Sequence, residues 1–242
     1  MGTKQVTVLE NNPEVMEALA RKLGLSPDLT FHDIYTLDEA ELKHHPGTAL
    51  ALITILPLTP TWKADREKED AAGMGEDYHR PGSNSPIIWF EQTIRDACGS
   101  IALLHAAVNG EGKKYISPGS VVEKIRDDAI SLAQAERAQM LHDSVPFEEA
   151  HQSVANMGDT ATPEMSGPSA KGQHFVAFVK AEGRLWELEG CRKGPIDRGE
   201  LGPDEDVLSP RAIELGLGRV IKLEQEAGNQ DLRFSCVAMV KE

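Results

Sequence analysis

Apolar residues recur at helical spacing in several parts of the chain. Val15, Met16, Leu19 and Leu23 form one such stripe. It follows Asn12-Pro13, a favourable helix start with proline at the first helical position, and Gly24 ends it. Similar patterns predict further helices beginning near Asp38, Ser120, Ala133, Pro146 and Ser209, the last a long one through Leu223.

Short apolar or alternating runs predict strands between these helices. Residues 49–56 are apolar on both faces, which is typical of a buried central strand. Strands at 175–180 and 184–188 meet at Glu182-Gly183, which predicts a hairpin. Shorter extended segments are expected at 5–9, 31–35 and 195–198, with 232–240 closing the sheet. No repeat or internal linker is visible, so we expect one α/β domain spanning residues 1–242.

Two stretches have no apolar period. Residues 64–85 are charged and Gly-rich, which predicts a mobile surface loop. Residues 157–171 are rich in Gly, Pro, Ser and Thr. A structureless stretch of this length inside a compact domain is often functional.

The segment from Gln92 to His105 joins a cysteine to an apolar helix. From Gly99 onward it is rich in Ala and Leu and free of proline, which predicts a buried helix. Cys98 lies near the first turn, where unpaired N–H groups and the helix dipole favour a thiolate. Gln92 offers amide donors, so the pair suggests acyl transfer with an oxyanion hole. For the cysteine alone, a packing role is the better explanation.

Helix geometry excludes the nearest histidine as the base for Cys98. His105 lies two turns along the same helix, about 10 Å away, too far for a hydrogen bond. We interpret it as a helix histidine with a partner of its own. Surface positions are expected for His32, His44, His45, His79, His142 and His151.

His174 is the better candidate base, because it opens a strand directly after the unpatterned stretch. If Ala181 faces Arg184 in the hairpin, Glu189 is a diagonal neighbour of His174 on the same face, about 7–8 Å away between backbones. Glu187 shares that face but lies further from His174. Either carboxylate can instead be an ordinary solvated one.

Three blocks of sequence resemble the ubiquitin C-terminal hydrolases, the papain-like cysteine deubiquitinases. Residues 92–105, Gln-Thr-Ile-Arg-Asp-Ala-Cys-Gly-Ser-Ile-Ala-Leu-Leu-His, look like the family's nucleophile motif. Residues 9–15 look like its Leu-Glu-x-Asn-Pro-Glu-Val block. Residues 174–179 and 185–190 are similar to its His-Phe-x-x-x-Val and Tyr-Glu-Leu-Asp-Gly. The resemblance covers nearly the whole chain.

The resemblance implies a papain-like fold with a mostly antiparallel central sheet flanked by helices. It implies that 157–171 is a crossover loop that gates the cleft. The implied reaction is thiol-dependent hydrolysis of acyl bonds at the C-terminal glycine of ubiquitin or a ubiquitin-like protein, with small or unfolded leaving groups. The implied catalytic residues are Cys98, His174, Glu189 and Gln92, and the implied substrate-binding residues are Leu9, Glu10, Glu14, Asp33 and Met165.

Two residues depart from the family pattern. Glu189 replaces its triad aspartate, and a glutamate can also orient a histidine. Asp96 replaces an asparagine and disfavours a nearby thiolate unless its charge is paired. Two alternatives therefore stay open: a ubiquitin-binding regulator with weak chemistry, and a thiol esterase or amidase for small substrates.

Charge and cysteine usage restrict the partners and the compartment. A net charge of −14 argues against nucleic acid and anionic membranes, and suits a basic partner. Many soluble cytosolic proteins are also acidic, so this evidence is weak alone. Cysteines 98, 191 and 236 show no metal or disulfide spacing, which fits a reducing compartment. We expect a cytoplasmic and also nuclear monomer with no metal, cofactor, signal peptide or membrane span.

Overall fold

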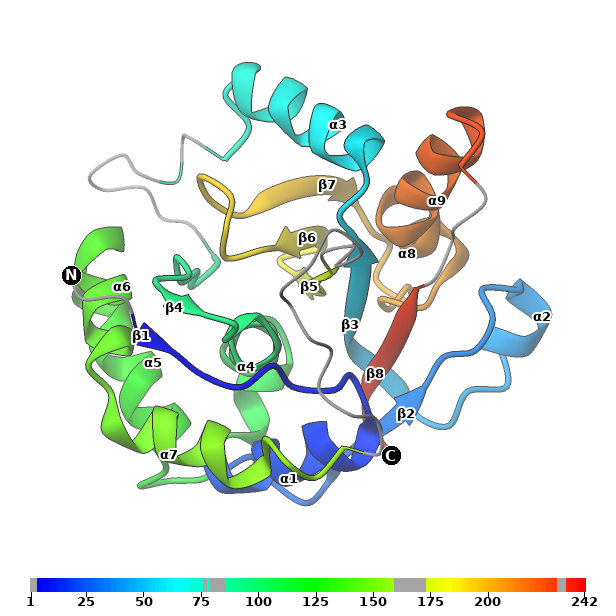
Figure 1. The fold of residues 1–242 in the computed structure, drawn as a ribbon. Helices are drawn as coiled ribbons and strands as arrows, with labels where there is room; N and C mark the ends of the chain where they lie inside the picture. Colours follow the sequence, from blue (N-terminus) through cyan, green and yellow to red (C-terminus); the bar gives the residue numbers. More distant parts are fainter. Residues whose placement is uncertain (1–3, 76–77, 79–85, 159–172, 230–233) are drawn as a thin grey trace.

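A six-stranded antiparallel sheet forms the centre of the protein, with helices on both faces (Figure 1). The computed structural model describes residues 4–75, 78, 86–158, 173–229 and 234–242. The strands lie in the order β2 (Leu29–Asp33), β8 (Ser235–Lys241), β3 (Thr48–Pro57), β5 (Gln173–Ala181), β6 (Arg184–Leu188), β7 (Ile196–Glu200). The expected mixed architecture with an antiparallel sheet is confirmed.

The remaining elements surround this sheet. A separate parallel pair joins β1 (Lys4–Gln5) to β4 (Ile94–Arg95). The helices are α1 (Pro13–Leu23), α2 (Glu39–Leu42), α3 (Pro60–Ala71), α4 (Cys98–Val108), η2 (Gly112–Tyr115), α5 (Val121–Ser131), α6 (Gln134–His142), α7 (Val145–Val154), α8 (Pro210–Leu215) and α9 (Leu217–Glu226). Within the described residues, no helix is long and apolar enough to cross a membrane.

The central strand β3 is buried on both faces, as its sequence predicts. Ala51 and Ile53 belong to the core that the sheet forms with α1, α4, α5 and α7. Leu52 and Leu56 point the other way, into a second core that includes Trp62 of α3 and residues of α8 and α9. Successive side chains of a strand alternate between faces, so one apolar run serves both cores.

The hairpin between β5 and β6 has the register expected from its turn. Ala181 pairs with Arg184, and Ala177 pairs with Leu188. Glu182 and Gly183 both have positive φ, 52° and 69°, as a two-residue turn of this kind requires. Because of this register, Glu189, the residue that follows β6, lies beside the start of β5.

The prediction of a mobile loop at 64–85 is wrong for its first part. Residues 60–71 form helix α3, capped by Thr59, whose side chain accepts a hydrogen bond from the Trp62 N–H. Its only buried residue is Trp62, so the helix shows no apolar stripe in sequence. Ion pairs hold it instead: Asp65, Glu69 and Asp70 contact arginines at positions 192, 198 and 219. Residues 76–77 and 79–85 lie outside the described part.

Three smaller predictions also need correction. The helix expected from Ser209 through Leu223 is broken at Gly216, where the backbone lies so close to the Phe178 ring that a Cβ would come within 3.0 Å. The strand β8 lies inside the sheet, between β2 and β3, and does not close it. The strand expected at 5–9 is the short β1, which pairs outside the main sheet.

Candidate active site

Cys98 is the first residue of α4, the apolar helix that packs against the sheet. The residue before the helix, Ala97, has no polar side chain, so the cap position itself leaves the N–H groups of the first turn open. Gly99 lets this helix end pack closely, because a Cβ there would lie 3.3 Å from both Leu9 and the Phe175 ring. Cys98 is therefore held beside the residue preceding Phe175, which is His174.

His174 lies near the start of β5, opposite Leu56 of β3, and is 8% exposed. Burial lowers its pKa, but contacts with the thiols of Cys191 and Cys98 and with the carboxylate of Glu189 outweigh burial and raise the pKa well above its usual value. The raised pKa makes the imidazole a better proton acceptor, so it can take and hold the proton of a neighbouring thiol.

Glu189 follows β6 directly and is the carboxylate that meets this histidine. Its Oε1 lies 3.0 Å from His174 Nε2, and the glutamate side chain is fully buried. Glu187, the weaker candidate, lies 2.7 Å from Nε of Arg198 instead. Burial raises the pKa of Glu187, but Arg198 outweighs this effect and lowers it. The geometry therefore selects Glu189 as the partner of His174.

Arg66 of α3 is a functional candidate that sequence reasoning missed. Its Nη2 lies 3.0 Å from Oε2 of Glu189 and donates a hydrogen bond to the Cys191 carbonyl at 3.1 Å. Its guanidinium also lies over the Trp62 ring, 4.5 Å from the centroid. Glu189 is thus held by His174 on one oxygen and by Arg66 on the other. The Thr59-Pro60 helix start was a signal for α3, but nothing local marks Arg66.

Replacing Arg66 with Met is expected to lower kcat about tenfold, equivalent to ~1.4 kcal/mol, with KM nearly unchanged. The reason is that Glu189 loses the cation that fixes one of its oxygens. Steady-state kinetics provide the measurement. Arg219→Met is the matched control, since Arg219 pairs with Asp65 and Glu69 of the same helix but is not an ion-pair partner of Glu189. An equal fall in both variants indicates general loosening of α3 and contradicts this role.

Gln92 lies against the segment that carries Glu189. Its backbone N–H donates to the Gly190 carbonyl at 2.8 Å. A Cβ on Gly190 would come within 2.9 Å of the Gln92 Cβ, so this close approach requires glycine. Among the described residues, the buried side-chain carbonyl of Gln92 has no hydrogen-bond partner. Gln92 and the start of α4 therefore lie on one continuous segment that bonds to the Glu189 side of the site.

Asp96 does not place an unpaired charge beside Cys98. Its carboxylate accepts a hydrogen bond from Gln5 at 2.7 Å and lies 3.8 Å from Nε of Arg95. Its φ is 65°, in the left-handed region that asparagine and aspartate tolerate better than most residues. The residue suits the backbone here, and its charge is directed to other partners.

Two buried histidines have structural partners. His105 accepts a hydrogen bond from the Phe90 N–H at 3.0 Å, and burial lowers its pKa to about 3, which confirms the sequence interpretation. His151 was expected on the surface but is 1% exposed. It lies 2.6 Å from the Ser100 hydroxyl and donates to the Thr7 carbonyl at 2.7 Å, so it joins α7 to α4 and the N-terminal segment.

The residues expected to bind substrate occupy different environments. Leu9 is 2% exposed and belongs to the core beside Gly99, so it is not a surface contact in this structure. Glu14 is exposed in the first turn of α1, and Glu10 is partly exposed four residues earlier. The Asp33 carboxylate, at the end of β2, accepts a hydrogen bond from Tyr35 at 2.9 Å. Met165 lies outside the described residues, as does most of the expected 157–171 crossover loop.

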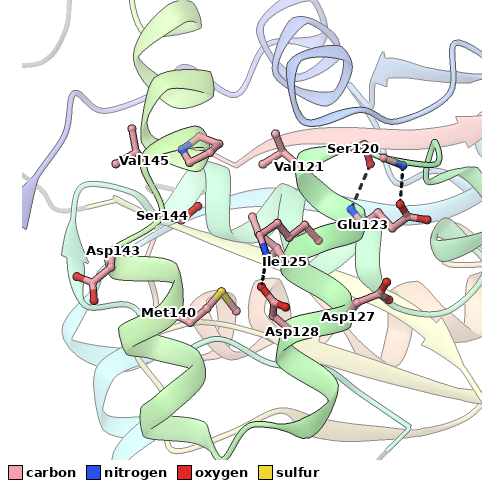
Figure 2. A pocket seen from close by; sticks show the side chains of 13 residues that line it. Ser120, Val121, Glu123, Ile125, Asp127, Asp128, Met140, Asp143, Ser144 and Val145 are labelled. Atoms are coloured by element: carbon pink, nitrogen blue, oxygen red, sulfur yellow. Dashed lines mark hydrogen bonds and ion pairs between the residues drawn. The ribbon is translucent and has the colours of Figure 1, made fainter.

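A separate cavity of about 780 Å³ lies between α5 and the junction of α6 and α7 (Figure 2). Val121, Ile125, Met140 and Val145 contribute its apolar surface, with acidic side chains around them. None of the catalytic candidates lines it. The candidate active site is therefore not in this cavity. It lies where α4, β5 and the end of β6 meet.

Comparisons with known proteins show the family of this chain. A family model described as ubiquitin carboxyl-terminal hydrolase, family 1, matches residues 6–218. The chain is 30% identical to "Ubiquitin carboxyl-terminal hydrolase 3" of Arabidopsis thaliana over 241 residues, covering 99% of this chain and 96% of that protein. It is also 30% identical to "Ubiquitin carboxyl-terminal hydrolase isozyme L1" of Rattus norvegicus, with 98% and 99% covered.

Solved structures share the fold. The chain resembles the catalytic domain of Trichinella spiralis UCH37 bound to ubiquitin vinyl methyl ester, with a TM-score of 0.72 and 19% identity. The match covers 98% of this chain and 95% of that one. The papain-like fold expected from the sequence is therefore confirmed.

Proposed function

This chain belongs to the ubiquitin carboxyl-terminal hydrolases of family 1, and from that premise we propose that it cleaves acyl bonds at the C-terminal glycine of ubiquitin. Members of this family are thiol-dependent hydrolases. The observation that carries the proposal for this chain is the single cluster of Cys98, His174 and Glu189, in which the imidazole contacts both the thiol and the carboxylate.

In the proposed reaction, Cys98 attacks the carbonyl carbon of the terminal glycine. His174 takes the thiol proton, gives it to the leaving group and then activates water to hydrolyse the thioester. Glu189 orients the imidazole and stabilises its charge. The Cys98 N–H, at the start of α4, and the Gln92 side chain, on the segment that leads into α4, are the donors that bind the oxyanion.

Two observations favour an active enzyme over a weak regulator. Glu189, in place of aspartate, reaches His174 at 3.0 Å, so the longer side chain is accommodated. Asp96 is engaged by Gln5 and Arg95, so its charge does not face the nucleophile unpaired. We propose small or unfolded leaving groups because Cys98 is partly buried and His174 almost fully buried, which restricts access to the scissile bond.

A fluorogenic amide at the ubiquitin C-terminus and a folded diubiquitin are the test substrates. We expect turnover of the fluorogenic amide and much slower cleavage of diubiquitin. A C-terminal ubiquitin electrophile should form one covalent adduct, at Cys98. Binding without turnover points to a regulator, whereas equal turnover of small esters lacking ubiquitin points to a general esterase or amidase.

Acidic residues near the N-terminus are proposed to attract ubiquitin's basic tail. Glu10, Glu14 and Asp33 lie around the start of α1 and the end of β2. Changing all three to their amides should raise KM several-fold at low salt through a slower association rate, and salt should erase the difference. Changing three exposed carboxylates elsewhere, Asp127, Glu214 and Glu226, to their amides controls for the general change of charge. A loss that persists at high salt, or no loss, assigns these carboxylates to helix-start and surface roles.

A further inference from the structure

Cys191 is a third reactive group beside the catalytic pair. It is exposed and follows Glu189-Gly190, so its backbone is fixed by the close approach of Gly190 to Gln92. Its thiol reaches the same imidazole as Cys98 does, and it contributes to the raised pKa of His174. The reaction proposed above uses Cys98 and leaves Cys191 without a role.

Three potential metal ligands converge at this point. One ligand atom each from His174, Glu189 and Cys191 lies within 4.8 Å of the other two. Within the part of the chain that the structure describes, His174 Nε2 and both Glu189 oxygens are buried without a hydrogen bond of good geometry, although Nε2 lies 3.0 Å from Oε1 and Arg66 lies 3.0 Å from Oε2. Buried polar atoms in such a state call for an explanation. Nε2 after loss of its proton, Oε1 of Glu189 and the Cys191 sulfur are donor atoms that can share a cation.

We propose that His174, Glu189 and Cys191 form a binding site for Zn²⁺ that inactivates the enzyme. A nitrogen, a carboxylate oxygen and a thiolate are the ligands that zinc accepts in a tetrahedral site, with water in the fourth position. Ligand atoms around tetrahedral zinc lie roughly 3.5 Å apart. The observed separations of at most 4.8 Å therefore close with small side-chain rotations.

The surrounding charges are compatible with this ion. A thiolate and a carboxylate balance the two positive charges of zinc. Arg66 contacts Oε2 of Glu189, which leaves Oε1 for the metal. A group that holds the second oxygen of a carboxylate ligand commonly orients that carboxylate toward the metal. Arg192, the next residue in the chain, is paired with Glu69 and Asp70. The exposed side of Cys191 provides the entry path.

Metal binding prevents His174 from acting as the base, because it determines which imidazole nitrogen carries a proton. Zinc displaces the proton of Nε2, which is released to solvent, so the proton that the ring keeps is on Nδ1. Nδ1 is the nitrogen that remains for Cys98, since Nε2 faces Glu189. A protonated Nδ1 cannot accept the thiol proton. Binding also releases the Cys191 thiol proton to solvent.

Cobalt spectroscopy tests the site without any activity. In Cys98→Ala protein, Co²⁺ is expected to produce the near-ultraviolet absorption of a cobalt–thiolate bond. The absorption should be lost in Cys98→Ala/Cys191→Ser, and retained in Cys98→Ala/Cys236→Ala, because Cys236 is buried in β8 beside Thr54. Absorption that is missing in Cys98→Ala, or that survives removal of Cys191, overturns the proposal.

Inhibition provides the second readout. With the fluorogenic ubiquitin amide and no chelator or thiol in the buffer, Zn²⁺ should inhibit Cys191→Ser at least about tenfold more weakly than the unchanged enzyme. Equal inhibition of the two proteins assigns the metal to Cys98 and His174 alone and contradicts the proposed site. The cobalt measurement stays informative even if ubiquitin is not the substrate, so failure of the site and failure of the function are distinguishable.

Discussion

Cys98→Ala should abolish turnover of a ubiquitin C-terminal amide while ubiquitin binding is retained. The thiol supplies the bond-forming electron pair, whereas recognition of a folded protein uses other groups. The substitution should fold normally, because alanine is a good helix former and Cys98 is only partly buried at the first position of α4.

The measurement combines fluorogenic kinetics with calorimetric titration of ubiquitin into the variant. Cys191→Ser is the matched control, since it removes a neighbouring thiol but should keep turnover in metal-free buffer. Measurable turnover by Cys98→Ala above the background rate would falsify the assignment of the nucleophile. Loss of ubiquitin binding in a variant that remains folded contradicts the separation of chemistry from recognition.

Glu189→Gln should lower kcat by about 10²–10⁴-fold, as removal of the orienting charge does in other catalytic triads. Gln keeps the shape but removes the negative charge that lies 3.0 Å from His174 Nε2. The neutral amide also leaves Arg66 without its buried anion. Glu189→Asp should retain most of the activity, because the charge remains and the side chain shortens by one methylene.

Glu187→Gln is the control for this second prediction. Glu187 is buried and bound to Arg198, so the substitution should lower the melting temperature and leave kcat close to normal in the folded fraction. Thermal unfolding is measured alongside kcat for each variant. If Glu187→Gln reduces kcat more than Glu189→Gln does, the assignment of the triad acid is wrong.

The sequence by itself determined the parts of the site that depend on local patterns. The Ala-rich run after Gly99 is a helix with Cys98 at its start, because a high content of helix-forming residues and the absence of proline decide helix formation locally. The two-residue turn at Glu182-Gly183 fixed the register of the hairpin. Side chains alternate between the two faces of a strand, so this register placed Glu189 on the same face as His174 and near it. Their pairing was therefore predictable.

Only the tertiary structure decided which distant charges meet. Helix α3 has no apolar stripe, and arginines more than a hundred residues away hold it in place. Arg66 reaches Glu189, and the Cys191 thiol meets the imidazole that also serves Cys98. Ion pairs and thiol contacts of this kind depend on where folded elements cross in space. Such crossings leave no period or spacing in the chain, whereas helix starts and hairpin turns do.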